Sequence, residues 1–202
     1  MSVDTIAQDK SLRRAVMTVA LLNLSYFSVE FAVAVSIGSV SLFADSIDFL
    51  EDTSLNLLIL VGLYWSPRNR GRLGMVLSVI LLIPGLATVW TAWLKFTSPI
   101  VPAPIPLSLT GLGALIVNTT CALILARFRG HGGSLTRAAF LSARNDALAN
   151  IAIILTGVVT SYTVSAWPDL IVGLGIAAMN AGAAIEVRQA ARIEHRQANS
   201  KP

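Results

Sequence analysis

Residues 38–52 read GSVSLFADSIDFLED, an apolar run that carries four acidic side chains within eight residues. The four acids are Asp45, Asp48, Glu51 and Asp52. The apolar segment Ser41–Trp65 around them is long enough for a membrane-spanning helix, which needs about 20 mostly apolar residues. An acid at the centre of a bilayer costs about 3 kcal/mol, so acids there are rare and usually functional. The stretch therefore predicts a transmembrane helix that carries a functional site.

The rest of the chain is equally apolar. Of its 202 residues, 54% are hydrophobic and 13% are charged, whereas a soluble domain has about 25% charged residues. Five further apolar segments are Ala15–Ile37, Leu73–Leu94, Leu107–Ala126, Ala138–Tyr162 and Leu170–Val187. They are too long and continuous for the strands of a membrane barrel, which alternate over about ten residues. We therefore predict an all-α membrane protein, a bundle of six transmembrane helices.

Lysine and arginine residues indicate how the helices are oriented. Basic residues cluster in segments 10–14, 68–72, 127–137 and 188–201, which six spans place on one side of the membrane, while only Lys95 falls on the other. The positive-inside rule then puts both termini in the cytoplasm, and we expect the plasma membrane, in a bacterium the inner membrane. The predicted organisation is a cytoplasmic segment 1–14, a transmembrane domain 15–187 and a short cytoplasmic tail 188–202. Because the positive charges lie at the ends of spans, the net charge of +4 indicates topology rather than nucleic-acid binding.

Helical spacing sorts the four acids of the second span. Asp48 and Asp52 are four residues apart and share a face, Asp45 lies on or near that face, and Glu51 is displaced to one side. Like charges this close repel each other unless they are protonated or bridged by a cation. Carboxylate oxygens suit hard or borderline divalent cations. The second span therefore predicts a site for a divalent metal ion.

The fifth span offers partners for this site. Asp146 brings another carboxylate, and Ser142, four residues earlier, brings a hydroxyl on the same face. Supporting roles around the site are predicted for residues that also stand inside apolar runs: Glu30, Asp45, Glu51, Arg144, Asn145 and Asn150. Glu51 and Arg144 either form an ion pair between the two spans, or Arg144 extends to the cytoplasmic boundary of the membrane.

Several of these residues match a known pattern. Residues 38–52, with Asn23 and Glu30 before them, resemble the first two spans of the cation diffusion facilitator family, where the order is Asn, Glu, Gly-x-x-Ser, Ala-Asp-Ser and Asp-x-x-x-Asp. Residues Pro168–Ala177 are similar to the family's last span, and Asn118 matches a position in its fourth span. The resemblance implies six helices, a divalent-cation site in the middle of the membrane, and export of the cation in exchange for protons.

The resemblance also implies a ligand set of two residues from the second span and two from the fifth. These are Asp48 with Asp52, and Ser142 with Asp146. Family members usually have His or Asp where this chain has Ser142, so an oxygen-rich site is expected to favour a harder cation than zinc. Candidate cargoes are zinc, cobalt, manganese, iron and cadmium. The cytoplasmic metal-binding domain that usually follows the last span is not expected in the short tail, so the chain resembles a truncated member.

Two alternatives remain at this point. A non-transporting structural or regulatory relative of the same fold would also fit the serine at 142 and the missing domain. A membrane phosphatidyltransferase has a comparable length and an acid-rich span, but its signature requires Asp-Gly and Ala-Arg pairs that are not present around Asp45 and Asp48. We predict a transporter and not an enzyme. Its expected partners are divalent cations, protons, the lipid bilayer and a second copy in a homodimer, with no nucleic acid.

Overall fold

The computed structural model describes residues 3–62, 86–128 and 133–179, without the side chains of residues 3–9, 59, 61–62 and 133–144. Six helical segments lie in these residues: α1 (Val3–Ile37), α2 (Val40–Gly62), a helix over residues 86–97, α4 (Pro104–Ala126), α5 (Gly133–Thr163) and a helix over Trp167–Met179. The predicted all-α, six-helix architecture is confirmed. The predicted span residues 73–85 and 180–187 lie outside the described residues.

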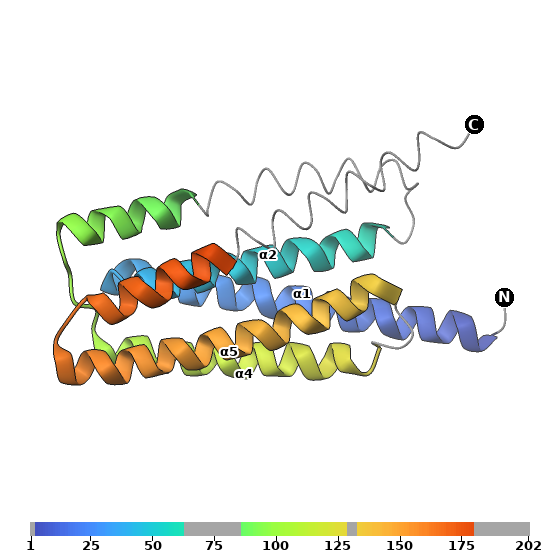
Figure 1. Ribbon diagram of the computed structural model, residues 1–202. Coiled ribbons are helices and arrows are strands. Elements are labelled where there is room, and N and C mark those ends of the chain that lie inside the picture. Colours follow the sequence, from blue (N-terminus) through green and yellow to red (C-terminus); the bar gives the residue numbers. More distant parts are fainter. Residues whose placement is uncertain (1–2, 63–85, 129–132, 180–202) are drawn as a thin grey trace, which may run out of the picture.

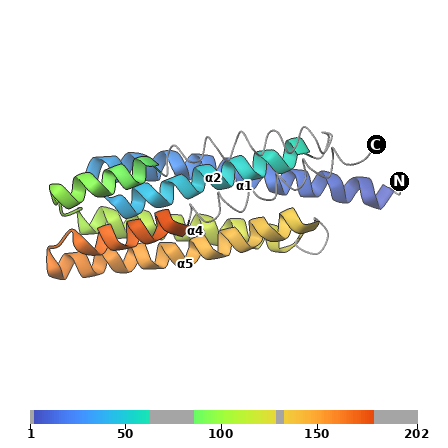
Figure 2. The same ribbon diagram turned by 45° about the horizontal axis from the view of Figure 1, so that its top comes forward.

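Four of the helices form a closed ring. α1 packs against α2 and α4, and α5 packs against α4 and α2. Figure 1 shows α4 and α5 lying side by side, with α1 and α2 as the neighbouring layer. The helices over residues 86–97 and Trp167–Met179 lie at the edge of this ring, as both Figure 1 and Figure 2 show. The start of α1 and the ends of α2 and α4 lie at one end of the bundle, as alternating spans require.

Three helices begin before the apolar segments that the sequence predicts. α1 begins at Val3 instead of Ala15, and α5 begins at Gly133 instead of Ala138. Hydropathy marks the part of a helix that lies in lipid, and residues 3–14 contain no glycine or proline to end the helix earlier. α4 begins at Pro104 instead of Leu107, because a proline in the first turn has no N–H to leave unpaired.

The turn between α1 and α2 is as short as the sequence predicts. Gly38 has a φ of +64°, the left-handed conformation that glycine adopts without a steric penalty. The N–H of Ser39 donates to the carbonyl of Ala34 at 3.0 Å, which closes the end of α1 in the way glycine-capped helices commonly end. α2 then begins at Val40, so the first two helices are held as a tight antiparallel pair.

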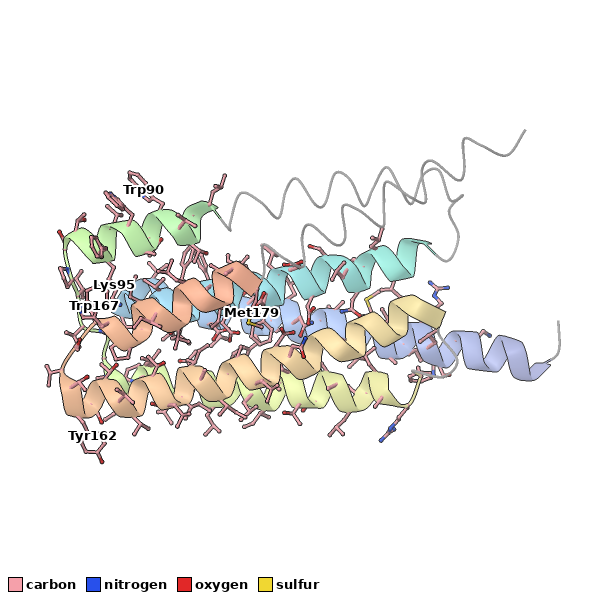
Figure 3. All side chains as sticks on the ribbon, in the orientation of Figure 1. Trp90, Lys95, Tyr162, Trp167 and Met179 are labelled. Atoms are coloured by element: carbon pink, nitrogen blue, oxygen red, sulfur yellow. The ribbon has the colours of Figure 1, made fainter. Side chains whose placement is uncertain are left out.

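The bundle is apolar outside and polar inside, as expected for a protein in lipid. Among its exposed side chains are Leu109, Ile116 and Leu123 of α4, whereas the buried ones include Asn118 of the same helix. In Figure 3, Trp90 and Tyr162 point away from the bundle. Three described stretches are long and apolar enough to cross a bilayer: Lys10–Ile37, Pro104–Ala126 and Asn145–Thr163. The family resemblance and these spans both indicate a membrane protein.

The interior of the ring is divided into layers along its length. One apolar cluster contains Val16, Val19, Leu60, Cys121 and Leu125. Another contains Ala34, Leu42, Ala44, Leu107, Ile153 and Ile176. In α1, α2 and α4, the stretches between the two clusters carry buried polar residues, and α5 adds another; among them are Asn23, Glu30, Asp45, Glu51, Asp52, Asn118 and Asn150. The polar layer therefore lies in the middle of the bundle, with an apolar cluster on each side.

Asp169 ties three parts of the fold together at the end of the bundle opposite the start of α1. Its carboxylate accepts hydrogen bonds from the backbone N–H groups of Val40 and Ser41 at 2.8 and 3.2 Å, and from the hydroxyls of Ser39 and Ser41, both at 2.6 Å. It also forms an ion pair with Lys95 at 2.5 Å, and both side chains are buried. Asp169 thus satisfies the free donors at the N-terminus of α2 and joins α2 to the helices over residues 86–97 and Trp167–Met179.

We expect Asp169→Ala to destabilise the protein more than Lys95→Met. Asp169→Ala removes the acceptor of the first donors of α2 and leaves a buried ammonium with the carbonyl of Gly38 but no counter-charge, and breaking a buried ion pair from one side typically costs about 3–5 kcal/mol. Lys95→Met removes the cation but leaves the carboxylate with four hydrogen-bond donors. Thermal unfolding of both purified variants in detergent checks this order. Equal losses, or a larger loss for Lys95→Met, would contradict it.

Candidate metal site

The predicted ligands Asp48 and Asp146 approach each other where α2 packs against α5. Both side chains are partly buried, and their carboxylates lie within electrostatic reach of one another. Asp52, one helical turn further along α2, is only 6% exposed. Acids this close in a medium of low dielectric favour the binding of a cation or of protons, because either one relieves their repulsion.

Asn23 of α1 supports the Asp52 carboxylate. Its amide nitrogen donates to Oδ2 of Asp52 in a long hydrogen bond of 3.4 Å, while its amide oxygen accepts from the thiol of Cys121 at 3.4 Å. Asn23 is one of the residues that carry the family resemblance, but the sequence does not predict its contact with Asp52. The available signal is its spacing from Glu30, since seven residues are two turns and place both side chains on the buried face of α1.

A second hydrogen-bonded chain crosses the layer at Asp45. The amide nitrogen of Asn150 on α5 donates to Oδ2 of Asp45 at 2.5 Å. The amide nitrogen of Asn118 on α4 donates in turn to the oxygen of Asn150 at 3.0 Å. All three side chains are buried. α2, α5 and α4 are therefore linked by one continuous polar contact beside the predicted ligands.

Two glutamates predicted to support the site are buried in different surroundings. Glu30 is fully buried and faces the carboxyl group of Asp45. Glu51 is 6% exposed, and its Oε1 atom has no hydrogen-bond partner among the residues that the structure describes. The side chain of Arg144 lies outside the described part of the chain, so the ion pair between Glu51 and Arg144 stays a prediction.

Asn145 and Asn150 lie on different faces of α5. Asn150 points into the bundle, whereas Asn145 is exposed. Asn145 lines a groove of about 440 Å³ between α5 and the helix over Trp167–Met179, together with apolar side chains such as Leu148 and Ile171. Asn145, which precedes Asp146 in the sequence, therefore faces open space.

The complete ligand set is not assembled within the described side chains. In that part of the chain, no three Asp, Glu, His or Cys side chains are grouped closely enough to hold a metal ion. The side chain of Ser142 lies outside the described part of the chain. The four-residue ligand set therefore stays a prediction, and for Asp48 and Asp146 the structure gives electrostatic reach only.

Comparison with known families identifies the family of the chain. The family model of the cation efflux transmembrane domain matches residues 16–188. No curated protein matches the chain. Because the match covers most of the 202 residues, the chain belongs to the cation efflux family. Members of this family are cation transporters in membranes and not enzymes, so the phosphatidyltransferase alternative is excluded.

We expect Asn23→Ala to weaken the binding of divalent cations by about tenfold or more. Residues that hydrogen-bond to metal ligands typically contribute 10–100-fold to metal affinity, because they fix the ligand's orientation. Cys121→Ser is the matched control, since a hydroxyl also donates to Asn23 and leaves the Asp52 contact in place. Titration of manganese and zinc into the purified proteins measures the affinities. Unchanged affinity in Asn23→Ala, or an equal loss in Cys121→Ser, would exclude this role for Asn23.

Proposed function

We propose that this member of the cation efflux family exports a divalent metal cation in exchange for protons, with the cation bound between α2 and α5. The proposed ligands are Asp48, Asp52, Asp146 and Ser142. Family membership supports the cation cargo. The observation that carries the location is the approach of Asp48 and Asp146 from two different helices within the polar layer.

The electrostatics of this layer favour a doubly charged cargo. Asp45, Asp48 and Asp52 lie on adjacent turns of one helix, and Asp146 adds a fourth carboxylate from α5. Lys95 is a buried lysine in the described part of the chain, but its ammonium is engaged by Asp169 and lies in a different part of the fold. A divalent cation neutralises two carboxylates at once, which makes its binding more favourable than that of a monovalent ion.

The donor atoms indicate which cations are favoured. Three carboxylates and one hydroxyl are all oxygen donors, and hard or borderline cations prefer them. Zinc sites more often include nitrogen or sulfur. We therefore propose that the site accepts manganese, cobalt, iron, cadmium and zinc with little preference for zinc.

Proton exchange in this chain would use carboxylates. Its two histidines, His131 and His195, lie outside the predicted spans. Binding of a cation to protonated acids displaces their protons, so the apparent affinity for the cation should fall as the solution becomes more acidic. An inward proton gradient across the membrane would then favour release of the cation on the acidic side.

The proposal includes an orientation and an assembly. We propose that the protein lies in the plasma membrane. The basic segments favour an orientation with both termini in the cytoplasm. A homodimer in the membrane is proposed as well. The second candidate function is a non-transporting relative, which the serine at position 142 favours because a usual ligand is then replaced.

Reconstituted vesicles separate a transporter from a non-transporting relative. We expect divalent-cation flux that a proton gradient accelerates, and a loss of about tenfold or more in Asp48→Asn, Asp52→Asn and Asp146→Asn, since an amide keeps the size of the side chain but not the charge. Asp9→Asn, in the N-terminal segment, is the matched acid-to-amide control and should transport normally. Wild-type protein without flux for any cation tested, or aspartate variants as active as the control, would refute transport through this site.

We expect Ser142→His to shift the selectivity toward zinc, because an imidazole nitrogen suits zinc better than a hydroxyl does. Competition between zinc and manganese for binding to the purified protein gives the selectivity ratio directly. Ser142→Ala serves as the control for loss of the hydroxyl alone. A wild-type protein that already binds zinc far more tightly than manganese would contradict the argument from Ser142.

A further inference from the structure

Glu30 is a buried acid without a donor. Its side chain is fully buried two turns before the end of α1, and neither carboxyl oxygen has a hydrogen-bond partner among the described residues. Oδ1 of Asp45 on α2 is also buried and has no donor in that part of the chain. The two carboxyl groups face each other within hydrogen-bond reach, and both are acceptors when ionised. A hydrogen bond between them therefore requires a proton on one of the two.

The asparagines beside Asp45 decide which acid holds that proton. Because Asn118 donates to the oxygen of Asn150, the nitrogen of Asn150 is directed at Oδ2 of Asp45. This donor stabilises the ionised form of Asp45, since an ionised carboxylate is the stronger acceptor. No corresponding donor reaches Glu30 from the described residues. The proton therefore belongs on Glu30, which donates it to the remaining oxygen of Asp45.

The surrounding charges favour the same arrangement. Among the side chains that the structure describes, the titratable ones that face the pair are Tyr26 of α1 and Asp48 and Asp52 of α2. α4 and α5 contribute the neutral amides of Asn118 and Asn150. The acids that face the pair add negative charge, which a proton on Glu30 partly offsets.

We propose that Glu30 and Asp45 form a proton-binding site separate from the cation ligands, in which Glu30 carries the proton. Asp45 lies three residues before Asp48, nearly one helical turn away. A divalent cation at Asp48 would repel a proton at this distance, so the O–H bond of Glu30 breaks and the proton leaves to water as the cation binds. This role in exchange rests on the proposed function, whereas the proton on Glu30 does not.

Infrared spectroscopy tests the proton directly. The purified full-length protein at neutral pH should show the carbonyl stretch of a protonated carboxylic acid, and Glu30→Gln should lose it. Glutamine keeps the size of the side chain and still donates to Asp45, so the fold is preserved. Asp45→Asn is the second variant and should shift the band to higher frequency, because the O–H loses its charged acceptor. Asp9→Asn is the control and should leave the band unchanged. A band with the same intensity and position in both Glu30→Gln and Asp45→Asn would overturn the proposal.

Flux in vesicles tests the role in exchange. Glu30→Gln should still carry cations down their own gradient, but a proton gradient should no longer accelerate that flux. Acceleration equal to that of the wild type would overturn the exchange role of Glu30. If the wild type carries no cation under any gradient, the proposed transport function fails, and the infrared result alone decides whether Glu30 holds a proton.

Discussion

A carboxylate inside a bilayer needs a proton, a cation or hydrogen-bond donors, and α2 carries four acidic side chains toward the centre of this bundle. Asp45, Asp48 and Asp52 have different partners in the fold. Asp45 is reached by an amide from α5 and Asp52 by an amide from α1. Asp48 instead faces another acid, Asp146. Neutral donors stabilise Asp45 and Asp52 without a cation, so we propose that the cation binds where Asp48 and Asp146 face each other.

The same requirement explains how the helices are arranged around α2. Its interior contacts need polar partners from α1, α4 and α5, which form the ring, and an apolar cluster lies on each side of the polar layer. At the far end, Asp169 and Lys95 fix the start of α2 to the two helices at the edge. A transporter of this kind exposes its site to one side of the membrane at a time. In the described part of the chain, a groove between α5 and the helix over Trp167–Met179 is lined by Asn145, the residue before Asp146.

Most of the fold follows from the sequence, because a bilayer permits few alternatives. Six apolar segments predict six helices, and the turn at Gly38 and the first-turn proline at 168 are where the sequence indicates. The starts of α1, α4 and α5 are not predicted, since hydropathy reports the lipid-facing part of a helix rather than its hydrogen bonding. Helical spacing also predicts which acids share a face of α2. It does not predict the partners that other helices bring, such as Asn23 for Asp52 or Lys95 for Asp169, because these depend on how the helices pack.

The central claim is that the carboxylate layer exchanges protons for a divalent cation. Calorimetric titration of manganese into the purified protein, repeated in buffers of different ionisation enthalpy, measures the protons released per cation bound. The account predicts saturable binding with a net release of protons that grows as the solution becomes more acidic within the range where binding persists. Binding without any proton release, or the absence of binding while the protein remains folded, would contradict it.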